Sequence, residues 1–130
     1  MLREHATEIR VRYSETDQMG YLHHSNYLSY FEVGRTELYR ADGGDYRRLE
    51  ESGLFFVVTQ IDCRYRRPAR YDDLLTITTR VVRVSHAKLE HEYEVTRDGD
   101  LIANARSVLA LVEGDGVVQR IPDHIRVPTA

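Results

Sequence analysis

The chain has 130 residues, of which 42% are hydrophobic and 30% charged, a composition that suits one globular domain with a modest core. Eighteen basic and twenty-one acidic side chains give a net charge of −3, which offers no overall attraction to nucleic acid. Its longest wholly apolar runs, 54–58 and 108–112, fall far short of the roughly 20 residues of a spanning helix, so we expect no membrane insertion. The single cysteine, Cys63, excludes an intrachain disulfide, and the charged first residues lack a signal-peptide core; both favour a cytoplasmic protein.

The N-terminal half of the sequence predicts one strand followed by two helices. Apolar and charged residues alternate over 7–13, which indicates a strand. A long helix is predicted over 26–41, with Ser25 as its N-cap and Gly43-Gly44 at its end, and a short helix over 45–52. Gly34 weakens the long helix by about 1 kcal/mol, which suggests that another backbone passes close to it. The apolar face of this helix holds Tyr27, Tyr30, Phe31, Gly34, Leu38 and Ala41.

The remainder of the chain predicts strands separated by turns. Asp98-Gly99 is typical of a hairpin turn, and Gly114 to Gly116 mark another turn. In the first of these strands, alternation predicts one shared face for Val57, Thr59, Ile61, Cys63 and Tyr65. The strands are expected at 57–66, 74–84, 89–96 and 101–112.

These elements predict an α+β domain over 1–130, in which an antiparallel sheet curls around one long helix. A single helix covers only one face of such a sheet. The last strand is nevertheless apolar on both sides, with Leu101, Ala103, Leu109 and Leu111 on one and Ile102, Val108, Ala110 and Val112 on the other. We therefore expect a second protein layer, another copy of the same chain.

One short stretch, 13–27, carries the most chemical information. Asp17 is followed by Gly20 and then by His23 and His24, which lead directly into the long helix. This order places an acid beside free backbone N–H groups that can hold an oxygen gaining negative charge, an arrangement suited to attack on an activated carbonyl. A turn-forming or capping role for Asp17 explains the spacing equally well.

The residues from Asp17 to Tyr27, with Phe31, Arg35 and Glu37 further on, resemble the signature of hotdog-fold acyl-CoA thioesterases, in the 4-hydroxybenzoyl-CoA thioesterase or YbgC-like branch. This resemblance implies the hotdog fold, a long helix wrapped by a curved antiparallel β-sheet. It implies homo-oligomers, dimers or homotetrameric dimers of dimers, with active sites at the dimer interface. It also implies an acyl-CoA substrate, no cofactor, and Asp17 as catalytic acid, acting as nucleophile or general base.

The same resemblance assigns the oxyanion donor to the backbone N–H of His24, whose imidazole is a further candidate for positioning substrate or water. Gly20 either allows the chain to turn with a positive φ or lets substrate approach the backbone closely. For the CoA moiety we expect contacts from Tyr21, Arg67, Ser85 and Lys88, although solvated charges on an exposed strand explain the cations as well.

Other chemistries are less well supported by the sequence. Adjacent histidines such as His23 and His24 rarely converge on one ion, so we expect no metal site. A serine elbow motif is absent, and Cys63 lies in the middle of a strand, which disfavours both nucleophiles. Three alternatives remain open: a thioesterase acting on acyl carrier protein, a hotdog hydratase or dehydratase, and a non-catalytic acyl-CoA-binding protein.

Overall fold

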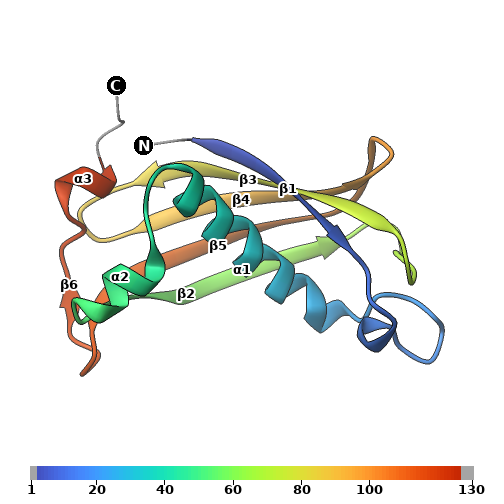
Figure 1. Ribbon diagram of the computed structural model, residues 1–130, viewed down its shortest axis with the longest axis horizontal. Coiled ribbons are helices and arrows are strands. Elements are labelled where there is room, and N and C mark those ends of the chain that lie inside the picture. Colours follow the sequence, from blue (N-terminus) through green and yellow to red (C-terminus); the bar gives the residue numbers. More distant parts are fainter. Residues whose placement is uncertain (1–2, 127–130) are drawn as a thin grey trace.

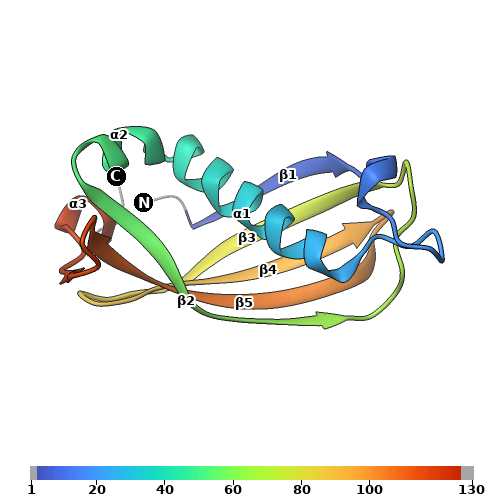
Figure 2. The same cartoon turned by 90° about the horizontal axis from the view of Figure 1, so that it is seen from below.

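A curved antiparallel sheet that wraps around one long helix dominates the computed structural model, which describes residues 3–126 (Figures 1 and 2). The long strands run in the order β1-β3-β4-β5-β2, and the short β6 pairs with β5. This arrangement confirms the predicted α+β architecture. The elements are β1 (Glu4–Arg10), the 3₁₀ helix η1 (Tyr13–Glu15), α1 (His24–Ala41), α2 (Tyr46–Glu51), β2 (Leu54–Tyr65), β3 (Leu74–Val84), β4 (Leu89–Arg97), β5 (Asp100–Glu113), β6 (Val118–Gln119) and α3 (Asp123–Arg126).

Three details of the N-terminal half differ from the sequence prediction. The first strand begins at Glu4 and ends at Arg10, because the chain turns into η1 at Tyr13. The long helix begins two residues early, and His23 rather than Ser25 is its N-cap, because the His23 side chain accepts a hydrogen bond from the Ser25 N–H. Ala41, predicted on the apolar face, is exposed, because Leu38 is the last residue of the helix that packs in the core.

A register irregularity in β2 changes which side chains face the helix. The pairing with β5 shifts between Val58 and Gln60, so one extra residue reverses the alternation. Before the shift Phe56 packs inward, and after it Ile61 does. The prediction that Val57 shares a face with Ile61 is therefore wrong, and Val57 and Val58 remain 38% and 43% exposed.

The core consists of two clusters along α1. The first surrounds Tyr27, Tyr30 and Phe31 near the start of the helix, and the second surrounds Leu38 near its end. Phe31 and Tyr93 of β4 are fully buried, and their ring centroids lie 4.7 Å apart, so this aromatic pair fills the middle of the molecule.

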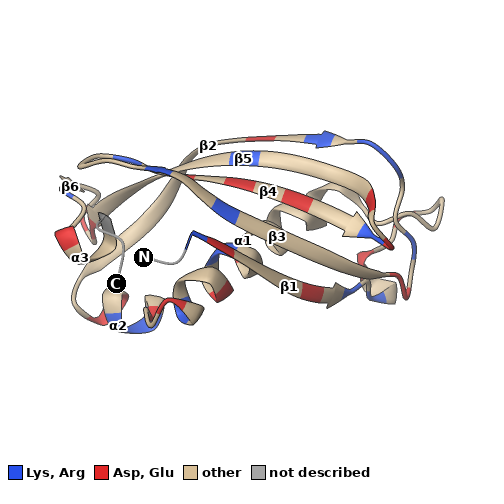
Figure 3. Cartoon of the chain, turned by 90° about the horizontal axis from the view of Figure 1, so that it is seen from above, with Lys and Arg blue, Asp and Glu red and all other residues tan. Residues whose placement is uncertain are grey.

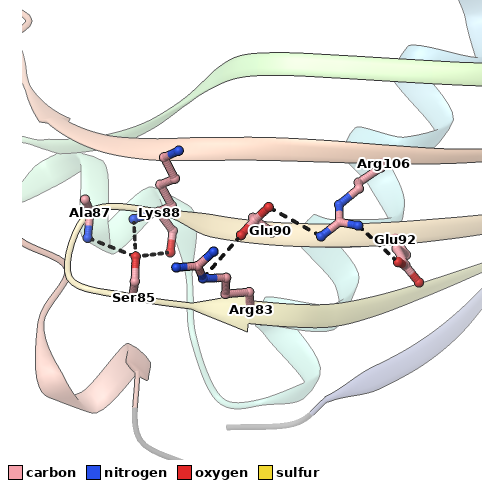
Figure 4. A network of polar contacts seen from close by, with 7 residues as sticks. All are labelled: Arg83, Ser85, Ala87, Lys88, Glu90, Glu92 and Arg106. Carbon is pink, nitrogen blue, oxygen red and sulfur yellow. Dashed lines mark hydrogen bonds and ion pairs between the residues drawn. The ribbon is translucent and has the colours of Figure 1, made fainter.

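The outer face of the sheet is charged over β3 and β4 (Figure 3). A network of ion pairs crosses these strands to β5: Arg106 lies 3.4 Å from Glu90 and 3.6 Å from Glu92, and Arg83 lies 3.7 Å from Glu90 (Figure 4). In β5 the prediction that Ile102 shares a face with Val108 is wrong, because a register shift beside Val95 turns the Ile102 side chain into the core with Ala103. The expectation that a second copy of the chain covers this face therefore depends on Val108, Ala110 and Val112, whose side chains are half-buried.

Gly34 lies against a side chain, not against the backbone that the sequence suggested. A Cβ at this position would overlap Thr79 Oγ1 and approach Ile77 Cγ2 to 3.1 Å. Thr79 is fully buried, and its hydroxyl has no hydrogen-bond partner among residues 3–126. The absence of a side chain at Gly34 therefore lets α1 approach β3 closely.

Gly34→Ala is expected to lower the free energy of unfolding by about 1–3 kcal/mol, because overpacking outweighs the gain of about 1 kcal/mol in helix propensity. Adding Thr79→Ala removes the obstructing hydroxyl, so the double variant should regain most of the loss. Urea unfolding of the parent, both single variants and the double variant measures this coupling. A Gly34→Ala variant as stable as the parent would contradict the close-packing account.

Candidate active site

The loop between η1 and α1 holds Asp17 in a tight turn. The Asp17 carbonyl accepts the Gly20 N–H at 2.9 Å, and Gly20 has a φ of +82°, which favours glycine. Asp17 Oδ1 accepts N–H groups from Met19 at 2.9 Å and from Tyr21 at 3.1 Å. In the described part of the chain Oδ2 has no partner. The turn thus fixes the carboxylate through one oxygen and leaves the other available.

Glu15, which the sequence analysis did not single out, ties this loop to the helix. Its side chain is buried, and Oε1 accepts hydrogen bonds from the Arg12 N–H and the Tyr30 hydroxyl, both at 2.8 Å. Burial acts to raise the pKa of Glu15, but these hydrogen bonds and the Arg12 guanidinium outweigh it and leave the pKa lowered. The Glu15 carbonyl also accepts the Asn26 side-chain amide at 2.9 Å, so one residue holds both ends of the loop.

The first turn of α1 leaves one backbone donor available. The Ser25 N–H donates to His23 Nδ1 at 3.2 Å, and the Asn26 N–H donates to the His23 carbonyl at 3.0 Å. His24 is the first residue of the helix, so its N–H has no helical acceptor, and no other acceptor for it occurs among the described residues. The positive end of the helix dipole lies at the same point.

A cleft of about 320 Å³ joins these groups. Four of the predicted site residues, Asp17, Tyr21, His24 and Arg67, line it together. The Arg70 guanidinium lies 4.8 Å from the centre of the Tyr21 ring, which holds that wall of the cleft in place. Arg67 is exposed and lies 3.6 Å from Asp100, a distance that leaves it free to exchange this partner for another anion. The remaining lining residues are Leu22, Tyr27, Tyr65, Arg66 and Pro68.

Tyr65 and Tyr27 are cleft residues that the sequence analysis did not assign to the site. The Tyr65 hydroxyl donates to the His24 carbonyl at 3.2 Å, so the end of β2 supports the start of α1. Burial and the neighbouring Cys63 raise the pKa of Tyr65 to about 12, and burial is the main cause of a pKa of about 12 for Tyr27. Both phenols are therefore protonated at neutral pH. Tyr27 and Tyr65 are 38 residues apart in the sequence, so only the fold shows that both line the cleft.

Ser85 and Lys88 lie elsewhere in the single chain. They form the turn between β3 and β4, where Ser85 Oγ accepts N–H groups from Ala87 at 3.3 Å and Lys88 at 3.0 Å (Figure 4). The length of β3, roughly 30 Å, separates this turn from the cleft. A role for these two residues at the site therefore requires a second copy of the chain, and it stays a prediction.

The described residues offer neither a metal centre nor a membrane-spanning helix. Within residues 3–126, no group of three histidine, cysteine, aspartate or glutamate side chains converges as metal ligands would. Among the same residues, no helix is long and apolar enough to cross a membrane. The arrangement at the cleft is instead a fixed carboxylate beside an available helix-start amide, which suits attack on a carbonyl carbon.

Comparisons with known proteins agree with this chemistry. Residues 11–127 match the family model of the thioesterase-like superfamily. An acyl-CoA thioesterase, YbgC, from Haemophilus influenzae is 35% identical over 106 residues, 81% of this chain and 78% of that protein. The crystal structure of a probable thioesterase from Bartonella henselae has a TM-score of 0.88 and 35% identity, covering 92% of this chain and 99% of that one. A DHNA-CoA thioesterase from Staphylococcus aureus gives a TM-score of 0.88 at 29% identity, covering 90% and 80%.

Proposed function

The chain belongs to the thioesterase-like superfamily of hotdog-fold thioester hydrolases, and from this premise we propose that it hydrolyses an acyl-CoA to a free acid and CoA, with Asp17 and the backbone N–H of His24 as the catalytic groups. One observation carries the assignment of these groups. Asp17, whose Oδ2 accepts no hydrogen bond from the described residues, and His24 at the helix start line the same cleft.

Two routes use this geometry. In the nucleophilic route, Asp17 Oδ2 attacks the thioester carbon, the C–S bond breaks, CoA leaves as a thiolate that takes up a proton, and water then hydrolyses the mixed anhydride. In the general-base route, Asp17 takes a proton from a water molecule whose oxygen attacks the same carbon; the C–S bond then breaks, and CoA leaves as a thiolate that takes up the proton from Asp17. Both routes place negative charge on the carbonyl oxygen, where an amide donor such as the His24 N–H contributes roughly 2.7–4 kcal/mol. The imidazole of His24, a residue that lines the cleft, positions the substrate or water.

The cations around the cleft support a substrate that carries phosphates. Arg66 and Arg67 line the cleft, and Tyr21 offers an apolar surface beside them. We assign the Ser85–Lys88 turn of a second copy to the same ligand, which makes a homo-oligomer, a dimer or a dimer of dimers, part of the proposal. No strand of residues 3–126 pairs with the outer edge of β2, where Val57 and Val58 are exposed, and this edge supports pairing of two chains. The unpaired thiol of Cys63 supports a cytoplasmic location.

A hydrolysis screen tests the proposed activity. Release of free thiol from aromatic and aliphatic acyl-CoAs of increasing length should identify at least one substrate, while hydration of an enoyl-CoA should not occur. The same acyl group carried on acyl carrier protein should be hydrolysed more slowly. Faster hydrolysis of the carrier-protein form would reassign the substrate to that class, and binding of acyl-CoA without thiol release across the panel would identify a non-catalytic acyl-CoA-binding protein.

A further inference from the structure

A second cavity, of about 530 Å³, lies at the other end of α1 from the cleft. It is enclosed by the last turns of α1, by α2 and α3, and by the adjoining ends of β2, β3 and β4. Arg35 on its wall lies about 16 Å along the helix from His24, and the buried pair of Phe31 and Tyr93 fills the space between the two sites. Its apolar lining includes Leu38, Leu49, Leu54, Phe56, Val81 and Leu89.

Polar groups without partners lie on the wall of this cavity. His91 of β4 is only 3% exposed, and its Nδ1 has no hydrogen-bond partner among the described residues. Burial, assisted by the positive charge of Arg35, lowers the pKa of His91 to about 3, so the imidazole is neutral at pH 7. The Arg35 guanidinium forms no ion pair within residues 3–126. An arginine with no ion pair in the described part of the chain, near a buried imidazole with an unsatisfied nitrogen, is suited to hold an anionic group.

The other charged groups around the cavity do not neutralise this position. Asp42 and Asp45 lie beside Tyr39, where they add to the effect of burial in raising the pKa of that phenol. Asp45 Oδ1 is already engaged as the cap of α2, since it accepts the Arg47 N–H at 2.9 Å. Tyr46 lines the same cavity as His91, and the charges of Arg35 and Glu32 both act on it; burial raises its pKa, so its hydroxyl is a neutral hydrogen-bond donor. Arg48 also lines the cavity, so two arginines and two aspartates belong to its wall.

We propose that this cavity is a separate binding site for an amphipathic carboxylic acid, with Arg35 pairing the carboxylate, His91 and Tyr46 offering hydrogen bonds to it, and the apolar walls enclosing the tail. One planar guanidinium matches one carboxylate, and the largely apolar lining suits an alkyl tail. The volume falls in the range of small-molecule sites. The proposal goes beyond the thioesterase activity and does not depend on it, because none of these groups lines the Asp17 cleft.

Calorimetric titration with decanoate and with the uncharged decanamide tests the site on the full chain. Decanoate should bind to the parent, and Arg35→Met should weaken its binding at least tenfold while leaving decanamide binding unchanged. The matched control is Arg47→Met, which removes an exposed arginine of α2 that pairs with Glu51. Equal affinity of decanoate for the parent and Arg35→Met, or no saturable binding to the parent, would overturn the proposal.

Photolabelling of the unmodified chain gives an independent result that does not require the variant to fold. A diazirine-bearing fatty acid should label α2 and the first half of β2, and the label should be displaced by decanoate. Labelling confined to the residues around Asp17 and Tyr65 would place the acid in the catalytic cleft and overturn the second site. Neither measurement uses a thioester. Both therefore test the second site even if the hydrolysis screen finds no substrate.

Discussion

Replacing Asp17 with asparagine is expected to lower turnover of a good acyl-CoA substrate by about 10²–10⁴ while preserving the fold, because a positioned acid or base contributes that much to rate. Asparagine keeps an oxygen that can accept the Met19 and Tyr21 N–H groups, so the tight turn stays intact. What the variant loses is the negative charge and the basic carboxylate oxygen, Oδ2, that the turn does not engage. Single-turnover and steady-state hydrolysis, with circular dichroism and size-exclusion chromatography on the same samples, measure this effect.

Asp62→Asn is a suitable control, because Asp62 is an exposed aspartate of β2 and does not line the cleft. It should hydrolyse substrate at the parent rate. Hydrolysis in heavy-oxygen water separates the two roles of Asp17, since only the nucleophilic route places label in its side chain after repeated cycles. An Asp17→Asn protein with parent activity would show that another group carries the chemistry.

The sequence alone brings candidate residues together where they are close in the chain. Asp17, Gly20 and His24 occupy one loop, so their spacing largely determines their geometry, and the strand-to-helix transition there follows from local patterns. The strands from Leu74 to Glu113 were also placed within one or two residues, because their alternation and turn residues are strong.

Features that depend on contacts distant in sequence could not be predicted in this way. The reversal of faces in β2 follows from one extra residue near Thr59, and nothing in the local alternation marks it. Glu15 has a partner fifteen residues away in Tyr30, and Tyr65 supports His24 across 41 residues. The wall of the second cavity is formed by residues of α1, α2, α3 and three strands. Such sites emerge only when the sheet has been folded around the helix.

The oxyanion role of the His24 amide leads to the second large effect, in the variant His24→Pro. Proline removes the backbone N–H, yet it is favoured at the first position of a helix, where that N–H has no helical partner. The preceding residue, His23, has φ −65° and ψ 136°, an extended conformation that proline tolerates in its neighbour. The variant should therefore fold normally, and the Tyr65 hydroxyl can still donate to the carbonyl of residue 24.

His24→Ala is the matched control, because it removes the same imidazole and keeps the amide. Relative to His24→Ala, His24→Pro should lose a further 10²–10³ in kcat, about 2.7–4 kcal/mol of transition-state stabilisation, with a much smaller change in KM. The comparison isolates the N–H because both variants lack the imidazole and share the same helix cap at His23. If the two variants hydrolyse substrate equally fast and unfold at the same temperature, the charge on the carbonyl oxygen is stabilised by a donor other than the start of α1.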